Sequence, residues 1–146
     1  MTASRQGRAR DLHHPVRHDG IDAMLDDARS RLDRVDVETA YREALAGALL
    51  VDIRPAAQRA AEGEIHPAVG GLVIERNVLE WRLDPRSDAR LPQAAYDARI
   101  LVLCQEGYTS SLAADSLRSL GLNATDVVGG FKAWREAFLP VACRDA

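Results

Sequence analysis

Cys104 is the residue of this sequence whose type and position most clearly suggest chemistry. Residues 100–103, directly before it, are apolar and mostly branched, which is typical of a strand buried on both faces. From Ser110 and Ser111 onward, apolar residues recur at helical spacing, and Gly121 suits the left-handed end of such a helix. The sequence therefore predicts a thiol at the carboxyl end of a central strand, on a short loop that leads into a helix beginning at Ser110 or Ser111.

That position favours a nucleophilic thiol and an anion-binding loop. Ligands of open α/β sheets bind at the carboxyl ends of the strands, and the first turn of a helix offers unpaired N–H groups and a positive dipole end. Both features of the helix start favour a thiolate over a thiol. Gly107 allows the loop to curl with its N–H groups facing inward, and the hydroxyls of Thr109 and Ser110 are further donors. We predict that Cys104 is the nucleophile and that the residues after it bind substrate: Gln105, Glu106, Gly107, Tyr108, Thr109 and Ser110.

The remaining chain alternates short apolar runs with segments of helical spacing, and these elements must position the loop. Besides 100–103, the apolar runs predict strands at 49–51, 72–74, 125–128 and a short one at Val35. Helical spacing predicts helices or helical turns over 21–32, 37–46, 56–62, 77–83 and 131–138, with Asp36 as the N-cap of the second. The core is expected to hold the large aromatic residues Trp81, Phe131, Trp134 and Phe138. Strands that alternate with helices indicate an α/β domain with a mainly parallel sheet covered on both faces.

Composition and length fit one ordinary soluble globular domain. The 146 residues carry a formal net charge of −3 and include two cysteines, too few for a disulfide scaffold. No apolar run approaches the roughly 18 residues that a membrane-spanning helix needs. We expect a cytoplasmic protein with no metal, no cofactor, no membrane contact and no nucleic-acid partner. Arginine outnumbers lysine eighteen to one, which is typical of a GC-rich bacterial genome.

Three segments are expected along the chain. Residues 1–20 predict a disordered N-terminal segment, although an arginine- and serine-containing leader is also compatible with a transit peptide or a weak nucleic-acid arm. Residues 21–140 form the folded domain, with the helix at 21–32 packed on its edge. Residues 141–146 are a tail, and Cys143 within it is interpreted as an incidental thiol.

Four short motifs resemble those of single-domain rhodaneses, in the same order and spacing. Residues 50–54 (Leu-Val-Asp-Ile-Arg) are similar to the family's Asp-x-Arg strand end, and residues 63–68 (Gly-Glu-Ile-His-Pro-Ala) to its Gly-His-Ile-Pro-Gly-Ala loop. Residues 104–110 stand where the family has its active-site loop, and residues 129–134 (Gly-Gly-Phe-Lys-Ala-Trp) resemble its closing Gly-Gly-x-x-x-Trp helix. The resemblance extends over residues 32–138 and so includes nearly the whole domain.

The resemblance implies a rhodanese-like fold, with a five-stranded, mainly parallel sheet flanked by helices, and sulfurtransferase chemistry through a persulfide on Cys104. It favours a supporting role for Asp52 and Arg54, which hold the loop in shape; an ordinary ion pair at the strand end is the alternative. The expected partners are a small-molecule sulfur donor and a thiol, cyanide or protein acceptor. The oligomeric state is left open.

Two departures from the family pattern stand out. Glu64 occupies a position where the family commonly has histidine, and His66 is an extra residue before Pro67. Glu106 lies in the loop where thiosulfate-using relatives often carry arginine or lysine. A carboxylate beside the anion-binding loop disfavours a dianionic donor such as thiosulfate.

Two other functions fit parts of this pattern. A related phosphatase needs an arginine that closes a Cys-x5-Arg loop and binds phosphate bidentately, but Ser110 occupies that position. A module that binds a partner or carries sulfur without turnover has the same fold, because fold alone does not fix function. The presence of Cys104 argues against this second alternative, and Glu106 keeps it open.

Overall fold

The computed structural model describes residues 16–142 and is built around a parallel sheet with the strand order β2-β1-β3-β4. The strands are β1 (Leu49–Asp52), β2 (Leu72–Val73), β3 (Arg99–Leu103) and β4 (Asn123–Asp126). Val102 of β3 lies beside Val51 of β1 on one edge and Asp126 of β4 on the other. The strand that leads into Cys104 is therefore central, as the sequence predicts.

The α/β class and the parallel sheet are confirmed, but within residues 16–142 the sheet has four strands instead of five. Val35 makes a single parallel bridge with Val127, just past the end of β4, and no more of a fifth strand forms. Asp36 explains why. Its side chain accepts a hydrogen bond from Thr39 N at 2.8 Å and starts a helix at once, so the chain leaves the sheet edge after one pair. This bond from the Thr39 backbone also holds the pKa of Asp36 below its ordinary value.

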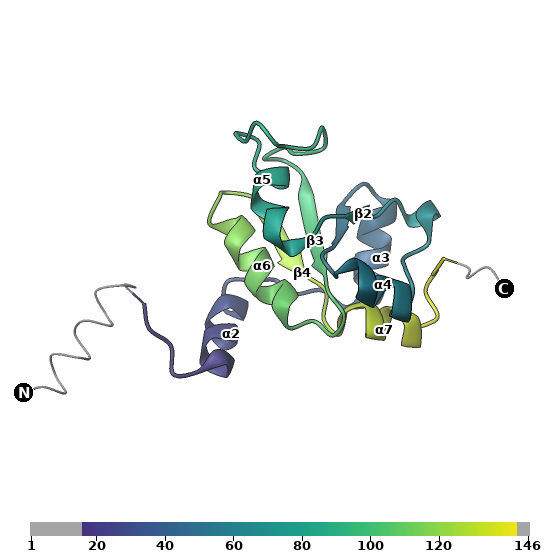
Figure 1. Ribbon diagram of the computed structural model, residues 1–146, viewed down its shortest axis with the longest axis horizontal. Helices are drawn as coiled ribbons and strands as arrows, with labels where there is room; N and C mark the ends of the chain where they lie inside the picture. The colour runs from purple at the N-terminus through teal and green to yellow at the C-terminus, as the bar shows by residue number, and fades with distance from the viewer. Residues whose placement is uncertain (1–15, 143–146) are drawn as a thin grey trace, which may run out of the picture.

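Helices cover both faces of the sheet. They are α2 (Ile21–Arg29), α3 (Val37–Leu45), α4 (Ala56–Glu62), α5 (Leu79–Leu83), α6 (Thr109–Arg118) and α7 (Gly130–Glu136), with short 3₁₀ turns at Pro67–Val69 and Arg76–Val78. Figure 1 shows α2, α5 and α6 on one side of the strands, and α3 and α7 on the other. α2 packs on α6, which in turn packs on β3 and β4. None of the helices in the described part of the chain is long and apolar enough to cross a membrane.

Alternate residues of β3 enter two separate cores. Ile100 and Val102 face α5 and α6, whereas Leu101 and Leu103 pack with Phe131 and Trp134 of α7. All four of these β3 residues are at most 1% exposed, as expected for a central strand buried on both faces. The two cores fix β3 from both sides and so fix the point at which Cys104 leaves the sheet.

The ends of several elements and the exposure of two aromatic residues differ from the sequence predictions. α6 begins at Thr109, one residue before Ser110, and β4 covers 123–126 instead of 125–128. Trp81 and Phe138 were expected in the core but are 60% and 94% exposed. Phe138 also has a φ of 57°, because it follows the last turn of α7 in the left-handed conformation that ends many helices.

Of the predicted N-terminal segment, 1–20, residues 1–15 lie outside the described residues, as does Cys143 in the predicted tail. Within 16–20, the imidazole Nε2 of His18 lies 3.2 Å from a carboxylate oxygen of Asp27 in α2. The division into the segments 1–20, 21–140 and 141–146 remains a prediction.

Candidate active site

The sulfur of Cys104 lies in a cradle of backbone N–H groups. Cys104 directly follows β3, and its Sγ accepts hydrogen bonds from Gly107 N at 3.2 Å and from Ser110 N at 3.4 Å. Ser110 is in the first turn of α6, where backbone N–H groups have no partner within the helix. Residues 104–110, which we call the Cys104 loop, therefore aim two N–H donors and the positive end of a helix at the sulfur.

A pocket of about 320 Å³ opens over this sulfur. Cys104 forms part of its lining and is only 5% exposed, so the thiol is recessed, whereas Glu106, Tyr108 and Thr109 are exposed. The pocket is lined by Ile53, Arg54, Pro55, Gln58, Cys104, Gln105, Glu106, Tyr108 and Thr109. The structure thus brings most of the predicted substrate-binding residues to one pocket, while Gly107 and Ser110 reach the sulfur through their backbones.

The start of α7 holds the first part of the loop. Phe131 N donates to the carbonyl of Cys104 at 2.8 Å, and Lys132 N donates to that of Gln105 at 2.9 Å. The approach is so close that a Cβ on Gly130 would overlap the carbonyl oxygen of Cys104. The Gly-Gly pair is recognised in the sequence as part of a family-like motif, but the motif does not reveal that its second glycine lies against the nucleophile's own backbone.

Asp52 and Arg54 form a buried ion pair that reaches the loop. The Arg54 guanidinium donates to both carboxylate oxygens of Asp52, with a shortest distance of 2.8 Å, and Arg54 is 1% exposed. It also donates to Gln105 Oε1 at 3.1 Å and to the carbonyl of Gly63 at 2.9 Å, and lies 4.0 Å from the centre of the Phe131 ring. The pair therefore contacts the loop through Gln105, which is the geometry that a supporting role requires.

A second polar network lies behind the loop, and no motif in the sequence signals it. Asp126, at the end of β4, has a fully buried side chain that accepts a hydrogen bond from Ser110 Oγ and another from Ser111 Oγ, both at 2.8 Å. Arg34 donates to the same carboxylate, at 2.9 Å through Nε. The expectation that the Ser110 hydroxyl adds a donor to the cradle is wrong, because that hydroxyl donates to Asp126; only the Ser110 N–H faces the sulfur.

The two departures from the family pattern have separate structural roles. Glu64 pairs with Arg59 of α4 at 2.8 Å, and the His66 ring accepts a hydrogen bond from Ala68 N at 3.0 Å, so both residues stabilise the 63–71 loop. Glu106 is exposed at the pocket and makes no ion pair with any residue that the structure describes. Since Asp52 already neutralises Arg54, the pocket walls carry an uncompensated negative charge at Glu106.

No group of three or more His, Cys, Asp or Glu side chains within residues 16–142 could hold a metal ion. The arrangement that remains is a single recessed thiol, oriented by backbone donors at a helix start. Such a site can attack an electrophilic sulfur and stabilise the negative sulfur that results.

Comparisons with known proteins agree with this reading. The model of the rhodanese-like domain family matches residues 25–137. A maize (Zea mays) protein named adenylyltransferase and sulfurtransferase MOCS3-2 is 37% identical over 87 residues, which make up 59% of this chain and 17% of that protein. The chain thus corresponds to only a small part of the curated relatives that it matches, 17% of one and 18% of a second maize protein.

Two solved structures share the fold. One is a protein of unknown function, possible tyrosine phosphatase, from Rhodopseudomonas palustris; it is 30% identical, with a TM-score of 0.76, and the match covers 87% of this chain and 97% of that one. The other is the polysulfide-sulfur transferase homodimer of Wolinella succinogenes, which is 22% identical with a TM-score of 0.66, over 84% of this chain and 87% of that one. At that lower identity the likeness concerns the fold alone. Because the family model matches residues 25–137, which are most of this chain, the protein belongs to the rhodanese-like domain family.

Proposed function

We propose that this protein is a sulfurtransferase that carries a sulfane sulfur as a persulfide on Cys104. The observation that carries the proposal is the pair of backbone N–H groups, from Gly107 and Ser110, that donate to Cys104 Sγ. The word sulfurtransferase in the name of the maize relative supports the same reaction class. In this reaction class the cysteine sulfur reacts as a thiolate and then carries a negatively charged persulfide. Backbone N–H groups such as those around Cys104 stabilise a negative sulfur in both forms.

The reaction has two displacement steps. The Cys104 thiolate attacks the sulfane sulfur of a donor, the new S–S bond forms as the donor's own bond to that sulfur breaks, and the leaving group departs with the electron pair. A thiolate or cyanide acceptor then attacks the outer sulfur of the persulfide, and the bond to Cys104 breaks to regenerate the thiolate. No net redox change occurs on the protein, and the loop donors stabilise the negative sulfur of each intermediate.

The charge of the pocket favours a donor that is neutral or singly charged. Among residues 16–142, Arg54 is the only cationic side chain that lines the pocket, and Asp52 pairs with it. Glu106, which forms no ion pair within the described part of the chain, adds a carboxylate at the pocket. Because like charges repel across a partly solvated pocket, a thiosulfate dianion is disfavoured relative to a persulfide-type donor.

Phosphate-ester hydrolysis fits the same residues less well. A phosphatase loop of this type would close with an arginine at position 110, and that residue is a serine whose hydroxyl donates to Asp126. The one guanidinium that the described residues place in the pocket wall, that of Arg54, is already bound to Asp52, to Gln105 and to the carbonyl of Gly63. The bidentate contact that phosphate transfer needs is therefore missing from the described pocket.

Steady-state sulfur transfer by two serine variants tests the proposal. We expect Cys104→Ser to abolish transfer from every donor tried, and Cys143→Ser, the matched control, to retain nearly all of it. An equal loss in both variants would point instead to a two-cysteine redox mechanism. Retained transfer in Cys104→Ser would overturn the proposal.

A further inference from the structure

Two arginines from the N-terminal part of the chain converge on the backbone of the Cys104 loop. Arg29, the last residue of α2, donates through Nη2 to the carbonyl oxygen of Gly107 at 2.8 Å. Arg34, in the segment between α2 and α3, donates through Nη2 to the same oxygen at 2.9 Å. Neither arginine lines the pocket over Cys104, so both act from behind the loop.

Each arginine also contacts a second group that holds the loop. Arg29 Nε donates to Ser111 Oγ at 3.0 Å, and Arg34 Nε donates to the buried carboxylate of Asp126 at 2.9 Å. Asp126 in turn accepts from both serine hydroxyls at the start of α6. The planar guanidinium fork allows one side chain to bind two acceptors in fixed geometry, which an ammonium group cannot do.

The shared acceptor is the residue that donates to the nucleophile. Gly107 N points at Cys104 Sγ while Gly107 O points at the two guanidinium groups, and the φ of 88° permits these directions. The C=O and N–H of one planar peptide point in opposite directions, so fixing Gly107 O also directs the N–H of Tyr108 away from the arginines. Two guanidinium groups against one carboxylate leave one positive charge in excess behind the loop.

We propose that Arg29 and Arg34 are positioning residues of the active site: they hold the carbonyl group of Gly107, and with it the backbone of the residue whose N–H donates to Cys104 Sγ, so that the cradle is preorganised around the sulfur. Helix α2 thereby contributes to the active site. This inference deepens the sulfur-transfer proposal and rests on it for its biological meaning. It predicts that loss of Arg29 lowers the reactivity of Cys104 toward any electrophile, including one that carries no sulfur.

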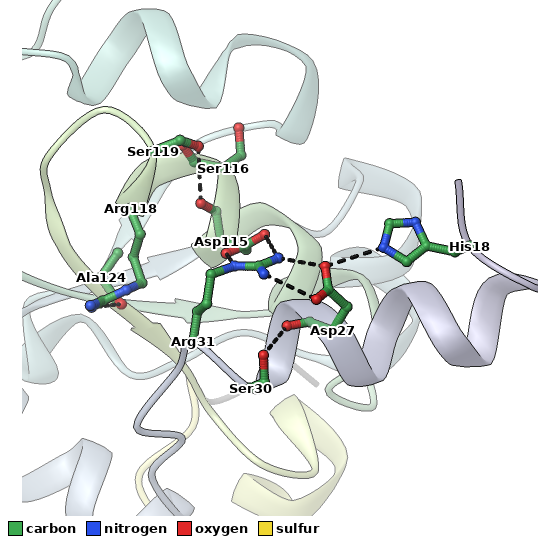
Figure 2. Close-up of polar contacts among 9 residues, drawn as sticks. All are labelled: His18, Asp27, Ser30, Arg31, Asp115, Ser116, Arg118, Ser119 and Ala124. Carbon is green, nitrogen blue, oxygen red and sulfur yellow. Dashed lines mark hydrogen bonds and ion pairs between the residues drawn. The ribbon is translucent and has the colours of Figure 1, made fainter. Parts of the chain in front are cut away.

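Arg31, two residues past the end of α2, offers a matched control. Its guanidinium pairs with Asp27 at 2.9 Å and with Asp115 at 2.7 Å, and so ties the end of α2 to α6 without touching the Cys104 loop. Figure 2 shows Arg31 between these two carboxylates, with His18 on the far side of Asp27. An Arg31→Met variant therefore removes a comparable tether of α2 and leaves the Gly107 contacts intact.

The test is the rate at which iodoacetamide alkylates Cys104 at neutral pH, measured by mass spectrometry in a Cys143→Ser background. We expect Arg29→Met to slow alkylation about three- to tenfold, because a charge-assisted bond to the loop is lost. Arg29→Lys should recover less than half of that loss, since lysine restores the charge but not the two-acceptor geometry. Arg34→Lys should slow the reaction as well, whereas Arg31→Met should leave the rate unchanged.

Thermal unfolding of each variant shows whether it is folded at the temperature of the alkylation assay, so that rates are compared only between folded proteins. If Arg29→Met reacts at the wild-type rate, or if Arg31→Met slows alkylation as much, the inference is wrong and α2 has only a structural role. Should Arg34→Lys fail to fold, the Arg29 and Arg31 variants still decide the outcome. Because alkylation requires no sulfur donor, a protein that never transfers sulfur but shows this pattern would overturn the proposed function and leave the positioning role standing.

Discussion

The contact between α7 and the Cys104 loop predicts a large effect for the smallest possible substitution, Gly130→Ala. A Cβ at this position would overlap the carbonyl oxygen of Cys104 and lie 2.8 Å from the carbonyl carbon of Gln105. Both partners are backbone, so no side chain can rotate to make room. The start of α7 has to move away from the loop, and the bonds from Phe131 N and Lys132 N to the loop carbonyls are lost or stretched.

The expected cost follows from these contacts. Gly130 has a φ of 58°. At such a φ, a residue with a Cβ lowers the free energy of unfolding by about 1 kcal/mol relative to glycine. Two weakened hydrogen bonds add about 1–3 kcal/mol. The free energy of unfolding should therefore fall by about 2–4 kcal/mol, which lowers Tm by roughly 10 °C for a domain of this size. Sulfur transfer measured well below Tm should also fall, because the backbone of the nucleophile is displaced.

Gly121→Ala is the matched control for this substitution. Gly121 has a similarly left-handed φ of 85°, and the one atom of the described residues that lies within 4 Å of an added Cβ is a ring carbon of Tyr96 at 4.0 Å. The Gly121→Ala variant should lose only about 1 kcal/mol of its free energy of unfolding and keep full activity. Thermal unfolding and steady-state transfer of both variants are the assays. If Gly130→Ala behaves like Gly121→Ala in both, α7 does not hold the loop as described.

Substitutions at three further positions have definite expected results. Glu106→Lys replaces repulsion by attraction at the pocket rim, so kcat/KM for thiosulfate should rise about tenfold and the gain should shrink with added salt; an unchanged value means that Glu106 does not act on the donor. The hydroxyl of Thr125 is buried without a partner among the described residues, so Thr125→Val should raise the free energy of unfolding by about 1–2 kcal/mol, whereas Thr125→Ser should not. Phe138 is 94% exposed and has a φ of 57°. Phe138→Gly should therefore raise the free energy of unfolding by about 1 kcal/mol, and Phe138→Ala should leave it unchanged, as measured by chemical denaturation.

The β3-loop-α6 unit could be predicted from sequence because its signals are local. The apolar run of β3 and the helical spacing after Ser110 lie within a few residues of Cys104, and the structure follows them to within one residue. The strand β4 was predicted two residues too late, at 125–128, because its first residue, Asn123, is polar and the two residues after its end, Val127 and Val128, are apolar. Asp126 belongs in a buried strand only because two serines and an arginine satisfy its carboxylate.

The supporting network behind the loop could not be predicted in the same way. Arg29 and Arg34 are separated by more than 70 residues from the Gly107 carbonyl that they share, and no sequence spacing links them. Trp81 and Phe138 show the opposite failure, since hydrophobic character alone assigned them to the core. Phe138 is exposed because it ends α7 in a left-handed conformation, a backbone requirement that its side chain does not signal.

The most direct test of the central claim is the loading and unloading of one sulfur atom on Cys104. The purified protein is incubated with a small persulfide donor, freed of donor, and then mixed with cyanide or a thiol, while intact mass and peptide mapping follow each stage. We predict a mass gain of one sulfur atom, located on Cys104 and lost when the acceptor is added, with Cys143→Ser behaving like the wild type. A protein that gains no sulfur from any donor, gains it on Cys143, or keeps it in the presence of every acceptor would contradict the account.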